Sequence, residues 1–145
     1  MTRPTPVDVR AITVKDPWAA AITHGGKNIE NRRRTWKWRG LLLIHTSATI
    51  DVPALADPHV AAAVRGRELQ PGKAVAVARL TDCHPDDGPC SPWAQPGLHH
   101  LVLHDVRPLP EPLPCRGALG PWTPSTDLWD QVLHQLPTLT VEATP

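Results

Sequence analysis

The stretch Gly25–Ser47, GGKNIENRRRTWKWRGLLLIHTS, decides the fold because it joins a helix stop, a basic segment and an apolar run. Two successive glycines are typical of the end of a helix, since a residue without a Cβ accepts the left-handed conformation found there. The run Leu41–His45 is almost wholly apolar and predicts a strand that is buried on both faces. The polar segment between these two features is rich in positively charged residues.

Six of the chain's fifteen Lys and Arg residues lie between Lys27 and Arg39, and Glu30 is the only acid among them. This segment carries a formal +5, and subtracting it from the +1 of the whole chain leaves −4 for the remainder. Positive charge concentrated in this way indicates contact with an anionic partner.

Outside this stretch, the pattern predicts short strands and helices rather than alternating strands and long helices. Asp16-Pro17-Trp18 is typical of a helix start, because Asp16 can cap free N–H groups and Pro17 suits the first helical position. Further helices are predicted at Pro58–Val64, with Asp57 as its cap, and at Ser125–Leu136. Strands are predicted at 11–14, 41–45, 74–80 and 98–106, and 27–32 is compatible with another.

Three segments have less regular expectations. Thr46–Asp57 is expected to be irregular, and Cys115–Trp122 is expected to form a closing strand or a bulge. Leu109–Pro114 is expected to stay out of a sheet interior, because proline has no N–H to donate. Together the elements predict an α+β fold, a small mixed β-barrel with two or three short peripheral helices.

The length of 145 residues predicts one domain, with its core at about 10–122 and a C-terminal helix at about 125–136. No apolar run has the length of a signal peptide or a membrane span, so we expect a cytoplasmic protein without membrane contact. Cys83, Cys90 and Cys115 are expected to be reduced thiols.

Lys27, Glu30 and Arg32 are the candidate site residues for chemistry, because a Lys, a carboxylate and an Arg within six residues can hold an anion or arrange proton transfer. A Lys beside an Arg releases its proton more easily, and Glu30 can accept a hydrogen bond from a substrate amine or act as a general base. The alternative is that Glu30 only pairs with Arg32 or Arg34 on a solvated surface.

The segment that follows has the composition of a nucleic-acid contact, since basic side chains bind phosphates and exposed rings stack on bases. The alternative is that its tryptophans close the base of the barrel, with one buried and one partly exposed. His45 and Ser47 follow the buried strand, where side chains often reach a cleft, although a single His there is also typical of a hydrogen-bonded core residue. The residues predicted to bind nucleic acid are Arg32, Arg33, Arg34, Trp36, Lys37, Arg39, His45 and Ser47.

A metal site is not predicted. Cys83-His84 with Cys90 and Cys115 offers ligands, but no CxxC pair is present and the spacing matches no common zinc module. His100 and His104 share a strand face with Val102, which argues against a compact cluster of strand histidines. We therefore expect neither a metal nor another cofactor.

Several of these motifs resemble the ASCH family, whose domains are related to the RNA-binding PUA domains. The likeness covers roughly residues 10–122 and implies a PUA-like β-barrel with a cleft lined by Lys27, Glu30 and Arg32. The segments that carry it are Asp16-Pro17-Trp18, Gly26–Arg32, Arg39–Ser47, Leu103–Leu109 and Pro114–Trp122.

The resemblance implies binding of nucleic acid, with RNA ahead of DNA, or of a nucleotide or nucleoside. Some bacterial members are hydrolases; one type removes the acetyl group from N4-acetylcytidine with a Lys, a Thr nucleophile and a Glu, and others are described as ribonucleases. Lys27 matches that lysine, but Glu30 stands at the threonine position and cannot attack as a hydroxyl does. The alternative function is therefore a hydrolase in which Lys27 is a base or electrostatic anchor and Glu30 activates water. A nucleotide sensor, or an interaction domain acting through the 82–97 loop, is a third reading.

Overall fold

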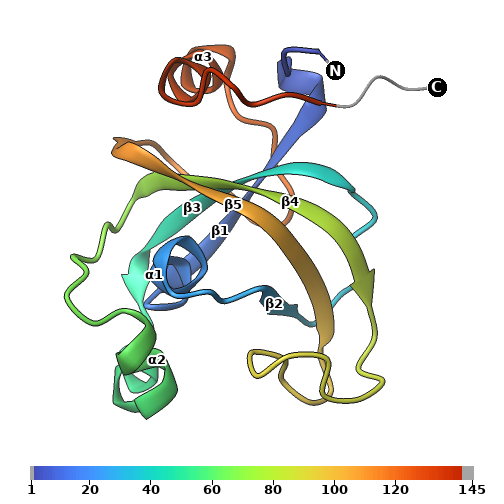
Figure 1. Cartoon of the computed structure of the whole chain (residues 1–145), viewed down its shortest axis with the longest axis vertical. Helices are drawn as coiled ribbons and strands as arrows, with labels where there is room; N and C mark the ends of the chain where they lie inside the picture. The colour runs from blue at the N-terminus through green and yellow to red at the C-terminus, as the bar shows by residue number, and fades with distance from the viewer. Residues whose placement is uncertain (1, 142–145) are drawn as a thin grey trace.

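A strongly curved five-stranded sheet with the order β1-β3-β4-β5-β2 forms the centre of the molecule (Figure 1). The computed structural model describes residues 2–141. The strands are β1 (Val9–Asp16), β2 (Ile29–Arg32), β3 (Gly40–Ile50), β4 (Lys73–His84) and β5 (His99–Pro114). The α-helices are α1 (Trp18–His24), α2 (Pro58–Ala63) and α3 (Thr126–Gln135), and the short 3₁₀ turns are η1 (Pro6–Asp8) and η2 (Pro53–Ala56). The predicted α+β class is confirmed.

The apolar run of β3 is buried on both faces, as its sequence predicts. Leu41 and Leu43 pack in one core cluster with Trp129 of α3, whereas Leu42 and Ile44 pack in another with Ile22 of α1. This division follows from the period of two along a strand, which sends alternate side chains to opposite faces. All four residues of the run are 0% exposed. Strand β3 therefore lies between the two halves of the core.

The sheet is not a closed barrel, and this corrects the prediction. Its edge strands are β1, which pairs in parallel with β3, and β2, which pairs antiparallel with β5. Within residues 2–141 no backbone ladder joins β1 to β2. Strand β2 has only four residues, and all of them pair with β5.

Leu109–Pro114 was expected to stay out of a sheet interior, and it does so, although it belongs to β5, which continues to Pro114 and pairs there with Lys73. Strand β2 covers only residues 99–102 of β5. Beyond that point, among the described residues, β5 has a neighbouring strand on one side alone, and a strand with a free edge tolerates proline. Thr46–Asp57 also differs from the irregular segment expected, since β3 extends to Ile50 and η2 follows.

The helix signals were read correctly for α2, whereas α1 begins at Trp18 with Pro17 in its N-cap position, one residue later than predicted. The backbone N–H of Ala20 in the first turn still donates to Asp16 Oδ1 at 3.0 Å, and Gly26 adopts the left-handed conformation (φ 76°) just after the helix. Asp57 Oδ1 accepts from the backbone N–H of His59 at 2.8 Å at the start of α2. The expected closing element at 115–122 is a single antiparallel bridge between Trp122 and Ala11 on the outer edge of β1.

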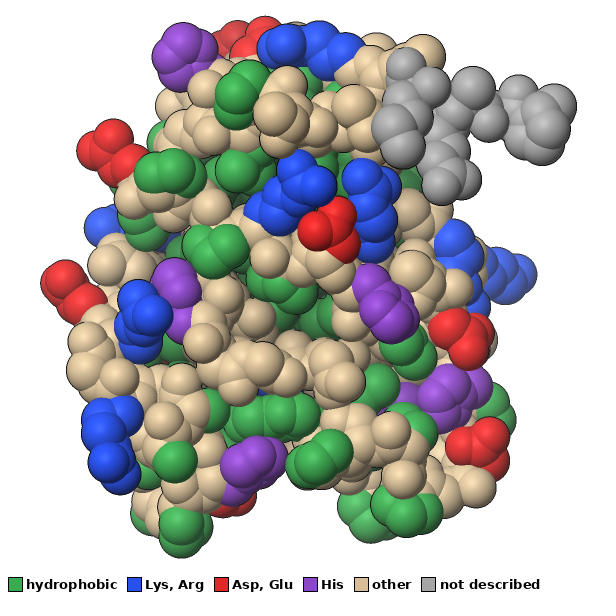
Figure 2. All heavy atoms as spheres, in the orientation of Figure 1, with side chains coloured by type: hydrophobic (Ala, Val, Ile, Leu, Met, Phe, Trp, Pro, Cys, Tyr) green, Lys and Arg blue, Asp and Glu red, His purple; other side chains and the backbone are tan. Residues whose placement is uncertain are grey.

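Charged side chains of both signs are interspersed over the face drawn in Figure 2, in keeping with the net charge of +1. The helices of residues 2–141 are all too short or too polar to cross a lipid bilayer.

Candidate functional site

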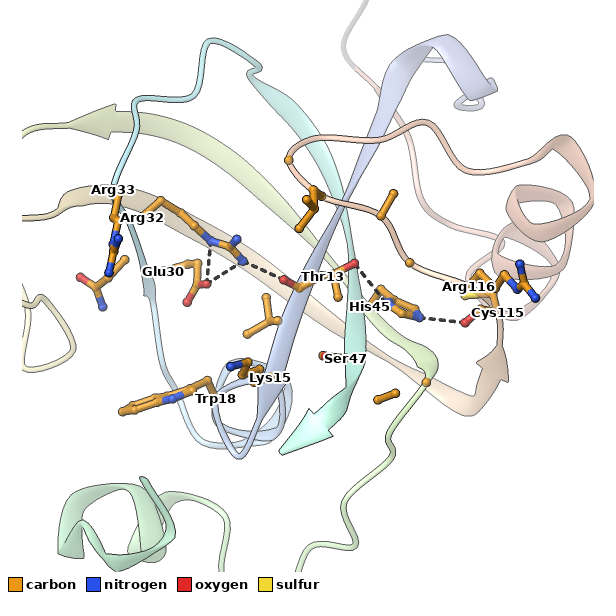
Figure 3. A pocket seen from close by; sticks show the side chains of 18 of the residues that line it. Thr13, Lys15, Trp18, Glu30, Arg32, Arg33, His45, Ser47, Cys115 and Arg116 are labelled. Carbon is orange, nitrogen blue, oxygen red and sulfur yellow. Dashed lines mark hydrogen bonds and ion pairs between the residues drawn. The ribbon is translucent and has the colours of Figure 1, made fainter. Parts of the chain in front are cut away.

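A cavity of about 890 Å³ opens beside the carboxyl ends of the parallel strands β1 and β3 (Figure 3). Thr13 and Lys15 of β1 and His45 and Ser47 of β3 stand at alternate positions along the strand face that α3 covers nearer its start. The cavity lies beyond this cover. The remaining lining comes from neighbouring residues of β1 and β3, from β2 and the residue after it, from Trp18, from the residues just before β4 and β5, and from the segment between β5 and α3. These residues are Val14, Trp18, Glu30, Asn31, Arg32, Arg33, Ala48, Gly72, Leu98, Cys115, Arg116, Gly117, Ala118, Leu119 and Gly120.

Glu30 and Arg32 form an ion pair on the cavity wall. Arg32 Nε and Nη2 each lie 3.0 Å from Glu30 Oε2, and Arg32 Nη2 also donates to the carbonyl oxygen of Thr13 at 2.8 Å. Both residues of the pair point to the same side of β2 because they are two positions apart. Within residues 2–141, the ion pair of Glu30 Oε1 is with Lys27 Nζ, at 3.7 Å, which is longer than a hydrogen bond. This oxygen therefore retains capacity to accept a hydrogen bond from a ligand.

Lys27 lies beneath this pair and does not line the cavity. The residue is 2% exposed, its Nζ donates to the carbonyl oxygen of Ile29, and the rings of Trp18 and Trp93 lie 5.3 and 5.7 Å from Nζ. Burial lowers the pKa of Lys27 from its usual value, the nearby Glu30 carboxylate opposes this shift, and Arg32 adds to it. Lys27 can therefore act on a cavity ligand only through Glu30.

Thr13 and His45 face each other directly in the β1–β3 register and join a chain of hydrogen bonds. His45 Nε2 lies 2.9 Å from the carbonyl oxygen of Cys115, which can only accept, so Nε2 carries the proton and Nδ1 accepts from the Thr13 hydroxyl at 3.2 Å. The Thr13 oxygen accepts in turn from the indole N–H of Trp122 at 3.2 Å. Burial lowers the pKa of His45, and the Cys115 carbonyl opposes the shift. The network suits a neutral imidazole that fixes one wall of the cavity.

The ASCH domain family model matches residues 12–101, which is more than half of the chain. The chain belongs to the ASCH domain family. The match includes Glu30, Arg32 and His45 but ends before Arg116. No curated protein matches this chain.

Two solved structures support the fold assignment. This ASCH domain is similar to the crystal structure of ASCH from Zymomonas mobilis, with 14% identity, a TM-score of 0.52, and coverage of 93% of this chain and 97% of that chain. A mutant of the Zymomonas mobilis protein gives 13% identity, a TM-score of 0.56, and coverage of 88% and 97%. At such identities the likeness establishes the fold.

The basic segment Arg33–Arg39, which the sequence predicts to contact nucleic acid, does not form one continuous surface in this ASCH domain. Arg33 lines the cavity, whereas Arg34 and Lys37 are exposed outside its lining. Arg39 lies in a separate hollow, where Nη1 donates to the carbonyl oxygens of Trp36 and Trp38 at 2.7 and 2.8 Å. Of the eight residues predicted to bind nucleic acid, four line the cavity: Arg32, Arg33, His45 and Ser47.

The two tryptophans of this segment divide as expected, with Trp36 7% exposed and Trp38 half-buried. Trp36 belongs to the core cluster beneath the sheet. The Arg32 guanidinium lies 5.8 Å from the centre of its ring. A ring covered in this way cannot stack on a base, so we leave Trp36 out of the binding surface proposed below.

Sequence reasoning did not assign Thr13, Lys15, Trp18 or Arg116 to the site. Thr13 lies in the predicted strand 11–14 and Lys15 just after it, but nothing in the sequence shows that this strand ends beside β2. The sequence pattern placed Trp18 at a helix start; in the structure it is half-buried at the cavity, with its indole N–H donating to Asp51 Oδ2 at 2.9 Å. The signal for Arg116 was its place in the Pro114–Trp122 segment of the family resemblance.

Proposed function

We propose that this protein binds RNA, with one nucleotide entering the cavity between β1, β2 and β3. The observation that carries the proposal is the 890 Å³ cavity with the Glu30–Arg32 pair in its wall. Small-molecule sites typically occupy about 300–1,000 Å³, so the space suits a nucleotide. Nucleic-acid binding is also the general expectation for ASCH domains, to which this chain belongs.

Glu30 is the proposed base-recognition residue. Its Oε2 is held by Arg32, while Oε1 can accept from an exocyclic amine such as that of cytosine or adenine. Because Arg32 is anchored to the Thr13 carbonyl, the carboxylate is held in place before the ligand arrives. Little side-chain ordering then remains to oppose binding.

The proposed backbone contacts are the exposed cations Lys15, Arg33 and Arg116 around the cavity. Figure 3 shows Arg33 and Arg116 on opposite sides of the cavity, so a strand that passes between them can place phosphates near both. Trp18 offers a partly exposed ring for stacking. The sequence instead predicted that the contacts would lie along the continuous segment Arg33–Arg39.

Fluorescence anisotropy with short labelled single strands of RNA and of matched DNA tests the proposal. We expect RNA to bind more tightly than DNA, with an affinity that falls with salt by a log–log slope of about −0.7 per phosphate contact. Glu30→Gln should weaken binding by about tenfold, the equivalent of one lost charged hydrogen bond, and Glu111→Gln, an exposed acid outside the cavity, is the matched control. Binding that ignores salt, or that responds equally to both variants, would contradict the proposal.

Hydrolysis of RNA or of an N-acylated cytidine is the second candidate, and the observation that favours it is the lowered pKa of Lys27 beside Glu30. Glu30 would activate water at the cavity wall, and Lys27 would position that carboxylate. The test is turnover of N4-acetylcytidine and of mixed RNA by the wild-type protein, Glu30→Gln and Lys27→Met. Turnover that is absent, or unchanged in both variants, removes this candidate.

Two broader expectations also belong to the proposal. A cytoplasmic location is in keeping with the three free cysteines. A single domain spanning residues 1–145, with its core at about 10–122, is in keeping with the one continuous sheet. Limited proteolysis and fractionation of expressing cells test these two statements.

A further inference from the structure

A cluster of three metal-ligating side chains lies apart from the cavity, at the end of β4 and the start of β5. We propose that His84, Cys90 and His100 bind a zinc ion or a divalent cation of similar softness. One nitrogen or sulfur atom from each residue lies within 4.8 Å of the other two. Figure 2 shows His side chains next to acidic ones over this end of the two strands. The inference is independent of the RNA-binding proposal.

The backbone brings the three residues together in two ways. His84 and His100 are direct partners in the antiparallel β4–β5 register, so their side chains project from the same face, with the rings edge to face at 5.3 Å. The loop between the strands then returns Cys90 to the same place, where its Sγ lies 3.5 Å from His100 Nδ1. Ligand atoms about 3.5 Å apart are what tetrahedral zinc requires, given bonds of about 2.1 Å to nitrogen and 2.3 Å to sulfur.

Backbone carbonyls fix which nitrogen of each ring is free for a metal. His100 Nε2 lies 2.8 Å from the carbonyl oxygen of Gln95, so this nitrogen carries the proton and Nδ1 directs its lone pair at Cys90. His84 Nδ1 lies 2.9 Å from the carbonyl oxygen of Pro85, which leaves Nε2 as the free nitrogen. Orientation of a ligating His by a carbonyl on its other nitrogen is the usual support around a protein metal.

Metal binding replaces one proton. With His100 Nδ1 as acceptor, the Cys90 thiol donates in the 3.5 Å contact, and the metal takes the place of that S–H hydrogen while the proton passes to solvent. One thiolate and two neutral imidazoles around a dication leave a charge of +1. Asp87 Oδ1 lies 3.5 Å from His84 Nδ1, so the surroundings favour a cation. Two nitrogens and one sulfur select zinc over magnesium or calcium and leave a fourth position for water.

The other two cysteines are committed elsewhere. Cys83 Sγ accepts from the backbone N–H of Trp36 at 3.4 Å, and Cys115 lies at the cavity. The set weighed from sequence, Cys83-His84 with Cys90 and Cys115, therefore contains two of the three proposed ligands. Sequence reasoning left His100 out of a metal site because its neighbours on the strand suggested no cluster. The β4–β5 register, which the sequence does not show, brings His100 beside His84.

The proposed metal would hold the 85–98 loop against the body of the protein. This loop covers β2 through Asn31, whose Nδ2 donates to the Trp93 carbonyl at 2.9 Å and whose Oδ1 accepts from the Gln95 N–H at 2.9 Å. Trp93 is 9% exposed and packs over Lys27. Release of the metal should therefore increase proteolytic cleavage within 85–98.

Cobalt(II) titration of the metal-stripped, reduced full-length protein tests the proposal. We expect one cobalt ion per chain, with thiolate-to-cobalt charge-transfer absorption in the near ultraviolet and the strong visible bands of a tetrahedral site, both removed by zinc. Cys90→Ser should abolish the charge-transfer absorption, while Cys83→Ser and Cys115→Ser retain it. His84→Ala should weaken binding more than about tenfold, because even the loss of a supporting residue costs about 10–100-fold. His104→Ala, an exposed position on β5, is the matched control.

Three results would overturn the site: no absorption at micromolar free cobalt, charge-transfer absorption that survives in Cys90→Ser, or an affinity that is equal in His84→Ala and His104→Ala. His84 is half-buried and Cys90 is exposed, so these variants test the ligands without removing the fully buried His100. Circular dichroism of each variant without metal verifies that it is folded.

Discussion

The guanidinium of Arg32, on β2, donates to the carbonyl oxygen of Thr13, on β1, at 2.8 Å and so spans the two edges of the open sheet. The same guanidinium holds Glu30 Oε2 through Nε and Nη2. One side chain therefore ties the two edge strands together and positions the carboxylate at the cavity. Loss of Arg32 should therefore affect both the stability of the fold and the geometry of the cavity wall.

Arg32→Ala should lower the free energy of unfolding by about 1–2 kcal/mol, because hydrogen bonds to charged groups contribute about 1.5–3 kcal/mol and the Arg32 side chain is partly exposed. Urea denaturation measures this loss. Arg32→Lys keeps the charge but not the fork that reaches both partners, so it should recover less than half of the loss. A change within about 0.5 kcal/mol for Arg32→Ala, the usual range for surface positions, would show that Arg32 does not tie the strands together.

Local signals predicted much of the fold. The apolar run Leu41–His45 identified the central strand, and Asp16, Asp57 and Gly26 marked helix ends because capping depends on a few neighbouring residues. Closure of the sheet was predicted wrongly, since it depends on whether the distant strands β1 and β2 meet, which local signals do not show. The prolines of Leu109–Pro114 indicated correctly that this segment avoids a sheet interior, but they could not show that it pairs along one edge, because a free edge is a property of the neighbouring strands.

The site was predictable in part. Glu30 and Arg32 share a strand face, and the period of two is enough to place them together. Their contacts with Thr13 and Lys27 depend on the sheet order and on the turn at Gly26, which the sequence does not show. Adjacent residues such as Arg33 and Arg34 look equivalent in the sequence, although only Arg33 lines the cavity. Side-chain burial, which separates Trp36 from Trp38, likewise depends on the folded arrangement.

Gly117→Ala should disturb the cavity wall without affecting the rest of the sheet. An added Cβ would lie 2.6 Å from His45 Nδ1 and closer still to Thr13 Oγ1, so the 115–120 segment must move. Overpacking of this kind costs about 1–3 kcal/mol, and we expect a matching fall in unfolding free energy and weaker RNA binding. Addition of Thr13→Ala removes the nearest of the clashing atoms and should recover part of the loss; a strictly additive double variant would contradict the proposed clash.

Acid should destabilise the protein through His45. Burial lowers its pKa in the folded state below the 6.5 of an unfolded chain, so as pH falls below 6.5 the unfolded state takes up a proton that the folded state does not. The contribution of His45 to the free energy of unfolding should therefore be constant above this pH and then decrease, by at most about 1.4 kcal/mol per pH unit, until the folded imidazole also protonates.

His45→Gln removes this contribution, so the difference in stability between wild type and variant should narrow as pH falls from 7 toward 5 in urea titrations. His24 also has a lowered pKa, caused by burial and by Arg67. The variant His24→Gln measures the contribution of His24 to the pH dependence of stability, which should be smaller because the residue is exposed. Parallel pH curves for wild type and His45→Gln would show that the imidazole titrates normally in the folded protein.

Arg33 and Arg34 offer a matched pair for the proposed RNA interface, since both are exposed, adjacent and equally charged, and Arg33 alone of the two lines the cavity. Loss of one phosphate contact should reduce the log–log salt slope by about 0.7 for a single strand. We therefore expect Arg33→Ala to weaken binding and to lower the slope by this amount, while Arg34→Ala leaves the slope nearly unchanged. Anisotropy titrations at several salt concentrations compare the two variants directly. Equal slopes would mean that the strand follows the whole basic segment from Arg33 to Arg39, as the sequence suggested, rather than entering the cavity.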